Sequence, residues 1–390
     1  MLHLTLSFLG LVALSFAVTH QDAAPTATWE SLEVDGQTLD FAVVEPAGLD
    51  RTVPVPVLIA LPPGAENRDM VDAGVELYWS QLARTGWVVL SPARADGAES
   101  FSKDAGQRVL ALLDLVQRRY AIEGGAPHLA GISNGGRAAF HLAGLFPARF
   151  LSMTCLPGMP NSDPNRARLA SVASLPVALF AGERDAGWAQ AAKDAQRELL
   201  ALGANQVELT IVPGAEHVVA TEDAGPIFET FARRRAEQQT LQQERLAIGR
   251  VLDDFHAAAA AADEERYFAH FAPGAVFVGT DTTERWTLPE FRAFALPHFQ
   301  GESAWIYTPK VRHVDLAPGL ETAWFDESLW SESYGATRGS GVLVRRGGTW
   351  RITQYVLSFP IPNELAKDVV ERIQALDAAP AKHQDGEGKK

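Results

Sequence analysis

The sequence contains one cysteine, Cys155, among 390 residues. A single thiol excludes an intrachain disulfide framework, a cysteine-ligated zinc site and an iron–sulfur cluster. Basic residues are also scarce, because 34 Lys and Arg face 48 Asp and Glu, for a net charge of −14. Binders of nucleic acid or anionic membranes generally show the opposite balance, so we expect neither partner. Beyond the first twenty residues no apolar run approaches the ~18 residues of a membrane span, so none is expected.

The first twenty residues differ from the rest of the chain. An apolar run from about residue 4 to residue 18 precedes a polar stretch, and Ser15-x-Ala17 fits a small-residue cleavage pattern. We predict a signal peptide over residues 1–19, and therefore a secreted or periplasmic protein, although no Lys or Arg precedes the apolar run. The alternative is a buried amphipathic first helix.

The segment from residue 28 to about residue 235 alternates short apolar runs with helical patterns at 105–120 and 188–202. Strand-like runs lie at 39–44, 55–61, 87–91, 128–132, 177–182 and 207–212. Such alternation predicts an α/β fold with a mostly parallel sheet and helices on both of its faces. We assign residues 28–238 to this domain and Cys155 to one of its buried strands.

The composition changes at residues 236–245, which read AEQQTLQQER. We expect one helix to end and another to begin here, with the domain boundary nearby. Residues 243–376 then read as helices followed by an antiparallel sheet, which predicts an α+β domain. Its strand-like runs lie at 275–279, 303–316, 321–332, 336–346 and 349–359, with Gly347 and Gly348 in a hairpin turn. Residues 377–390 have almost no apolar bulk and predict a disordered tail.

The sequence Gly131-Ile-Ser133-Asn-Gly135-Gly136 lies between a predicted strand and a predicted helix. This is the G-x-S-x-G pattern of a nucleophilic serine on a sharp strand-to-helix turn, where flanking side chains would collide with neighbouring backbone. The turn exposes the serine hydroxyl and places the next backbone N–H at a helix N-terminus, where it can stabilise an oxyanion. Ser133 is therefore the candidate nucleophile.

A serine hydroxyl needs a base within hydrogen-bond reach, and the expected order is Ser, then Asp or Glu, then His. Asp185 follows the strand at 177–182 and is the candidate acid, with Glu183 as the alternative in the same loop and Asp163 as a weaker one. His217 follows the strand at 207–212 and is the candidate base. These loops can converge because the carboxyl ends of parallel strands meet at one edge of a sheet.

The oxyanion needs a second backbone donor, which we expect from the loop after the strand at 55–61. Pro62 and Pro63 carry no N–H and cannot donate. Ala65 is therefore the preferred donor and Gly64 the alternative, with the N–H of Asn134 as the other donor.

With these motifs in place, residues ~28–235 resemble an α/β-hydrolase of the esterase or dienelactone-hydrolase type. Gly131–Gly136 matches the nucleophile elbow, 182–185 the acid loop and 214–217 the histidine loop. The resemblance implies an acyl-enzyme mechanism and hydrolysis of a small-molecule ester, less often of a thioester or peptide bond. Such families often have His-Gly in the early loop, where this chain has Pro63-Gly64.

Residues ~243–376 resemble the SnoaL-like branch of the nuclear-transport-factor-2-like superfamily, through the stretches 275–286, 338–342 and 349–364. The resemblance implies a cone of helices packed on a curved sheet around a pocket. Trp286, Trp324, Asp326 and Arg338 are the candidate pocket residues. The alternative is a surface ion pair of Asp326 with Arg338, beside tryptophans of the core.

The leading hypothesis is a secreted serine hydrolase that cleaves a carboxylic ester. One alternative is a peptidase of prolyl-oligopeptidase type, because G-x-S-x-G-G also suits those enzymes. Another is a binding protein whose SnoaL-like pocket captures a ligand or whose second domain forms a homodimer. No nucleotide-binding glycine motif and no metal-ligand spacing is present, so we expect neither a cofactor nor a metal.

Overall fold

The computed structural model describes residues 25–103 and 106–377. The chain forms two compact units, which divide between Gln239 and Thr240. The predicted signal peptide at 1–19 lies outside the described residues, as does the predicted tail after residue 377. Among the helices of the described residues, none is long and apolar enough to cross a membrane.

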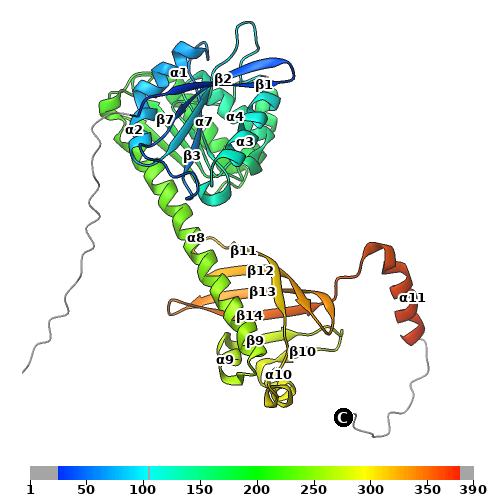
Figure 1. The fold of residues 1–390 in the computed structure, drawn as a ribbon. Helices are drawn as coiled ribbons and strands as arrows, with labels where there is room; N and C mark the ends of the chain where they lie inside the picture. The colour runs from blue at the N-terminus through cyan, green and yellow to red at the C-terminus, as the bar shows by residue number, and fades with distance from the viewer. Residues whose placement is uncertain (1–24, 104–105, 378–390) are drawn as a thin grey trace, which may run out of the picture. The chain divides into compact units, whose positions relative to one another are not determined.

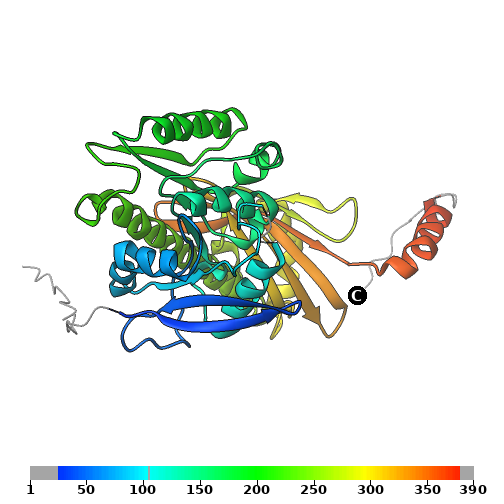
Figure 2. The same cartoon turned by 90° about the horizontal axis from the view of Figure 1, so that it is seen from above.

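An eight-stranded sheet forms the centre of the first unit, in the order β1-β2-β4-β3-β5-β6-β7-β8. The strands are β1 (Thr28–Val34), β2 (Gln37–Val44), β3 (Val57–Leu61), β4 (Val88–Pro92), β5 (His128–Gly131), β6 (Met153–Cys155), β7 (Val177–Gly182) and β8 (Val207–Val212). From β4 to β8 all neighbours are parallel, whereas β1, β2 and β4 pair antiparallel. The mostly parallel sheet confirms the predicted fold class. The edge strand β1 was missed, and Figure 2 shows its hairpin with β2 in dark blue.

Helices cover both faces of this sheet and enclose two apolar cores. The helices are α1 (Arg68–Gly74), the π-helical turn η1 (Val75–Trp79), α2 (Ser80–Arg84), α3 (Gly106–Arg119), α4 (Asn134–Leu145), α5 (Asp163–Ala167), α6 (Leu169–Val172) and α7 (Ala186–Ala201). Side chains of α3, α4 and α6 pack on one face, and those of α1, η1 and α2 pack on the other. Cys155 is fully buried on β6, as predicted.

One continuous helix, α8 (Gly225–Ala260), runs through the predicted boundary, so the expected break near residues 236–245 is wrong. Residues 236–245 are rich in Gln and Glu and contain no Gly or Pro, so nothing in this stretch stops helix propagation. Ile227 and Phe231 belong to a core of the first unit, whereas Ile248 and Leu252 belong to the core of the second.

The second unit is built on a six-stranded sheet in the order β10-β9-β14-β13-β12-β11, with a single parallel pair, β9 with β14. Its elements after α8 are α9 (Glu264–Ala269), β9 (Phe271–Val278), β10 (Arg285–Thr287), α10 (Leu288–Ala295), β11 (Thr308–Leu316), β12 (Thr322–Ser331), β13 (Gly335–Arg346), β14 (Thr349–Ser358) and α11 (Ala366–Asp377). The C-terminal part of α8, together with α9 and α10, packs on the sheet around one aromatic core (Figure 1). The strand expected at 303–316 begins later, at Thr308.

Candidate active site

Ser133 lies between the end of β5 and the start of α4. Its backbone has φ 55° and ψ −110°, a positive-φ conformation that non-glycine residues rarely adopt. Strained backbone of this kind persists only where the surrounding structure holds it, and it is concentrated at functional sites. The sharp turn predicted for the G-x-S-x-G sequence is therefore present.

The glycines of this turn are required by close backbone packing. A Cβ atom on Gly131 would lie 2.0 Å from the carbonyl oxygen of Gly135. A Cβ on Gly135 would lie 2.1 Å from the oxygen of Leu61, and one on Gly136 would lie 2.1 Å from the oxygen of Pro157. Backbone atoms cannot rotate away as side chains can, so any larger residue at these positions would displace the turn.

The structure brings Ser133, His217 and Asp185 together from three different loops. The hydroxyl of Ser133 lies 2.8 Å from Nε2 of His217, and Nδ1 of His217 lies 2.5 Å from Oδ2 of Asp185. A carboxylate only accepts hydrogen bonds, so Nδ1 carries the proton of the neutral imidazole. Nε2 is then the acceptor for the serine proton. The hydrogen-bond chain therefore has the polarity that general-base activation of a serine needs.

Asp185 is held in place by the helix that follows it. It is the N-cap of α7, and its Oδ1 accepts the backbone N–H of Trp188 at 3.4 Å. The indole of Trp188 meets the His217 ring edge-on, with ring centres 4.9 Å apart. The Arg137 guanidinium lies over the same indole, 4.6 Å from the Trp188 ring centre. Trp188 therefore restrains both the acid and the base, a role that the sequence pattern did not reveal.

The alternative acids have other partners. The carboxylate of Glu183 accepts the backbone N–H of Gly214 at 2.9 Å and so fastens the histidine loop to the acid loop. Asp163 is the first residue of α5, which is capped by Ser162. Of the three carboxylates considered, only Asp185 contacts the imidazole.

The loop after β3 is tied to the start of α4. The side-chain amide of Asn134 donates to the carbonyl oxygen of Gly64 at 2.8 Å. Within the described chain, the backbone N–H groups of Asn134 and Ala65 have no hydrogen-bond acceptor. The first N–H groups of a helix have no partner inside the helix, which explains why that of Asn134 is free. Both proposed oxyanion donors are thus present as unpaired N–H groups.

A buried carboxylate shapes this loop, and the sequence did not reveal it. Glu66 is 1% exposed and has a positive φ of 59°. Its oxygens accept the N–H of Phe101 and the hydroxyl of Ser100. The guanidinium of Arg94 lies 3.6 Å from the same carboxylate and donates to the carbonyl of Ala65. Burial raises the pKa of Glu66 above its usual value, although these hydrogen bonds and Arg94 lower it.

A second candidate site is a cavity of about 350 Å³ in the second unit, and Trp286 lines it. The other three predicted pocket residues do not, which corrects that prediction. Trp324, Asp326 and Arg338 are exposed, on strands β12 and β13. Asp326 faces Ser340 across the strand pair and contacts His313 at 3.2 Å instead of Arg338.

The physical reason is the two-residue period of a strand. Alternation shows that Trp324 and Asp326 share a face, but it does not show which face points inward. In β12 the inward residues are Phe325, Glu327 and Leu329. The tryptophans of this strand are therefore not core residues either, because Trp324 is 47% exposed.

The inward face of β12 carries a polar cluster that sequence reasoning missed. Glu327 is fully buried, and its Oε1 accepts from Nε2 of His256 at 2.7 Å and from the hydroxyl of Tyr355 at 3.1 Å. Its Oε2 accepts from Arg312 at 2.8 Å. Although burial alone raises the pKa of Glu327, the hydrogen bonds from His256 and Arg312 and the charge of Arg312 lower it below its usual value. Among the described residues, no group of His, Cys, Asp and Glu side chains could hold a metal ion.

Comparison with known families bears on both units. A sequence profile described as "Putative esterase" matches residues 32–270, which is more than half of the chain. The chain belongs to this esterase family. A second profile, described as a SnoaL-like domain, matches residues 248–362 of the chain. Both predicted resemblances are therefore confirmed, and the predicted enzyme class, a serine hydrolase acting on carboxylic esters, agrees with the family.

Solved structures resemble one or the other unit at low identity. A thermostable esterase is 15% identical over 52% of this chain and 60% of its own length, with a TM-score of 0.41. Est1E from Butyrivibrio proteoclasticus is 13% identical over 54% of this chain and 99% of its own length, with a TM-score of 0.42. An NTF2-like protein of unknown function from Pseudomonas putida KT2440 is 16% identical over 30% of this chain and 87% of its own length, with a TM-score of 0.26. No curated protein matches this chain significantly.

Proposed function

We propose that this protein hydrolyses a carboxylic ester through an acyl-enzyme, with Ser133 as nucleophile, His217 as base and Asp185 as the group that orients the imidazole. The observation that carries the proposal is the unbroken hydrogen-bond chain from the Ser133 hydroxyl through His217 to Asp185. The His217 side chain is 39% exposed, so a substrate can approach it. Membership of an esterase family supports the same reaction.

The proposed mechanism follows from this geometry. The Ser133 oxygen attacks the ester carbonyl carbon while His217 Nε2 takes the hydroxyl proton. The backbone N–H groups of Asn134 and Ala65 donate to the oxyanion that develops. Protonated Nε2 then gives its proton to the departing alkoxide, which leaves an acyl group on Ser133. Water, deprotonated by the same imidazole, cleaves the acyl-enzyme and releases the acid.

Labelling with a fluorophosphonate probe tests the nucleophile directly. We expect the probe to modify Ser133 and p-nitrophenyl acetate to be hydrolysed. Ser133→Ala should abolish labelling and lower turnover by at least about 10³-fold while the fold is retained. Folded protein that neither reacts with the probe nor hydrolyses esters would overturn the proposal. Faster cleavage of a chromogenic peptide than of the ester would instead favour the peptidase alternative.

For the second domain we propose a ligand-binding role, because its aromatic cavity of about 350 Å³ is within the size range of small-molecule sites. A homodimer is a second proposal, supported by the exposed Trp324 and Trp330 on the outer face of β12. Sedimentation of the full chain, compared with that of the Trp324→Glu variant, tests the homodimer. We expect a dimer that the added charge dissociates, and a monomeric parent would refute it.

We also propose export of the protein, on the apolar run before residue 19 and its cleavage pattern. N-terminal sequencing of protein recovered from outside the cytoplasm should begin near residue 20. Recovery of the protein only inside the cytoplasm, with its first residues intact, would contradict export.

A further inference from the structure

The cavity of the second unit is walled mainly by aromatic rings. Phe277 and Phe291 stack with ring centres 3.8 Å apart, and Trp286 stacks against Phe291 at 5.9 Å. Trp305 meets Tyr267 edge-on at 5.4 Å. Such walls favour a flat aromatic ligand, because aromatic rings gain from stacked and edge-on contacts as well as from burial.

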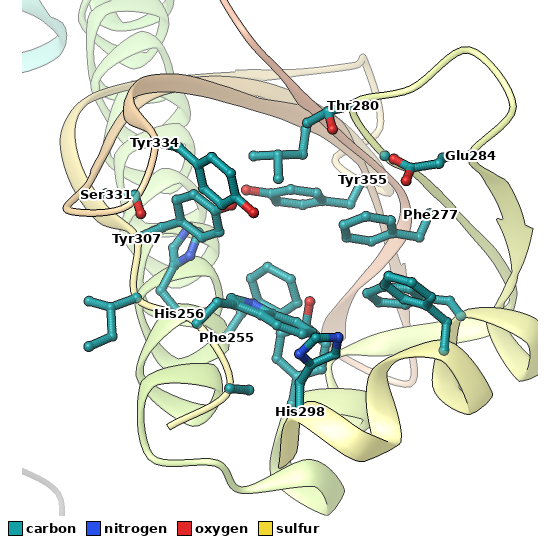
Figure 3. Close-up of a pocket in the computed structure, with 18 of the residues that line it drawn as sticks. Phe255, His256, Phe277, Thr280, Glu284, His298, Tyr307, Ser331, Tyr334 and Tyr355 are labelled. Carbon is teal, nitrogen blue, oxygen red and sulfur yellow. The ribbon is translucent and has the colours of Figure 1, made fainter. Parts of the chain in front are cut away.

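One end of the cavity is polar. Figure 3 shows the side chains of Tyr307, Tyr334 and Tyr355 gathered on the side of the cavity where His256 lies. Burial, together with the neighbouring Tyr334, raises the pKa of Tyr307 to about 12, so its hydroxyl stays protonated at neutral pH. The hydroxyl of Tyr267, a cavity residue that is only 1% exposed, has no acceptor for its proton in the described chain. A buried hydroxyl without an acceptor is costly unless a ligand or water completes it.

His256 supplies a hydrogen-bond acceptor at this end. Its Nε2 faces the Glu327 carboxylate at 2.7 Å, and the lowered pKa of Glu327 keeps that group ionised, so Nε2 carries the proton. In a neutral imidazole the other nitrogen, Nδ1, is then an acceptor. Nδ1 has no hydrogen-bond partner within the described residues, and His256 lines the cavity. Arg312, which donates to the other Glu327 oxygen, fixes the carboxylate and through it the ring.

The charges around the cavity disfavour an anionic ligand. Among the described residues that line the cavity there is no Lys or Arg. Glu284 does line it, and its carboxylate lies at the end away from His256 (Figure 3). An anion in the cavity would lose its hydration without gaining a Lys or Arg partner, which is costly. The walls, the hydroxyls and the imidazole are all suited to an uncharged molecule that donates a hydrogen bond.

We propose that this cavity binds a neutral phenol, with its ring between the aromatic walls and its hydroxyl donating to Nδ1 of His256 and accepting from a tyrosine hydroxyl. The inference rests on the ligand-binding role proposed above for this domain and specifies its ligand class. It is independent of ester hydrolysis, because none of its residues belongs to the first unit.

Calorimetric titration of the full chain with three two-ring compounds tests the proposal. 2-Naphthol carries the phenolic donor, 2-methoxynaphthalene lacks it, and 2-naphthoate carries a negative charge. We expect 2-naphthol to bind at least about fivefold more tightly than either of the other two, since one hydrogen bond is typically worth that factor. His256→Gln and Tyr307→Phe should each weaken 2-naphthol binding by about three- to tenfold and leave 2-methoxynaphthalene unchanged.

Tyr120→Phe is the matched control, because it removes a hydroxyl that donates to Glu45 in the first unit. It should leave naphthol binding unchanged. If His256→Gln does not fold, Tyr307→Phe carries the test alone, since it deletes a single oxygen. Equal affinity for naphthol and its methyl ether, or tighter binding of the naphthoate, overturns the phenol assignment but leaves a ligand-binding domain. If none of the three compounds binds, both the phenol assignment and the ligand-binding role of the domain are overturned. Labelling of Ser133 reports on the esterase site separately.

Discussion

The histidine loop and the acid loop pack backbone against backbone at Gly182, which makes this glycine a sensitive test of the site. A Cβ atom there would lie 1.9 Å from the carbonyl oxygen of Glu216, the residue before His217. Two backbone hydrogen bonds join the same loops, from the N–H of Glu183 to Val212 and from that of Arg184 to Ala215. Gly182→Ala must therefore separate two loops that are otherwise fastened together.

The size of the effect follows from the geometry. Real Cβ atoms essentially never lie closer than 3.0 Å to another atom, so the 1.9 Å contact must lengthen by more than an ångström. The displaced atoms are adjacent to His217 and three residues from Asp185. A displacement of ~1 Å at catalytic groups can cost ~10²-fold in rate. We expect Gly182→Ala to lower kcat/KM for p-nitrophenyl acetate by about that factor.

Gly187→Ala is the matched control. Gly187 lies in the first turn of α7, close in sequence to Asp185, and a Cβ there would meet nothing within 4 Å. Its activity should stay within about twofold of the parent, because alanine favours helix. Circular dichroism and thermal unfolding confirm that both variants fold. A folded Gly182→Ala with full activity, or an equal loss in Gly187→Ala, would refute the reasoning.

Three further predictions concern individual side chains. Asp185→Asn should lower kcat for ester hydrolysis by about 10³–10⁴-fold, because an amide no longer holds the required tautomer, whereas Glu183→Gln should change it far less. Burial raises the pKa of Cys155, so iodoacetamide should leave the native thiol unmodified, by mass spectrometry, and alkylate it in urea. Glu327→Ala should destabilise the second unit by about 3–5 kcal/mol, measured by urea unfolding, because it removes the buried carboxylate that accepts from Arg312, His256 and Tyr355 and leaves Arg312 with the exposed Asp253 as its counter-ion. The pKa of Glu327 is lower in the folded protein than in the unfolded chain. The stability that this carboxylate contributes is therefore fully present above the unfolded pKa of about 4.3 and is lost as the pH falls through the folded pKa. Similar losses of kcat in Asp185→Asn and Glu183→Gln would contradict the first expectation. Alkylation of the native Cys155 thiol would contradict the second, and an unchanged urea midpoint for Glu327→Ala would contradict the third.

Much of the first unit could be predicted from local patterns. Strands buried on both faces read as continuous apolar runs, so most of the parallel strands were located. Edge strand β1 was missed because its residues are half-buried or exposed and it lacks such a run. The continuity of α8 was missed for another reason. The polar sequence was interpreted as the end of one helix and the start of another, yet a polar segment of strong helix formers remains helical when apolar residues at both of its ends are packed in cores.

The sequence by itself determined the elbow around Ser133, because the glycines that permit it are adjacent in the chain, and the order of the candidate acid and base. Only the tertiary structure distinguished Asp185 from Glu183. The two lie in one loop, and their partners come from a loop some thirty residues later, so their separate contacts depend on how β7 and β8 pair. The tertiary structure likewise decided that Glu327 and not Asp326 faces inward. A two-residue period defines the two faces of a strand, but which face is buried depends on the packing of α8 against the sheet.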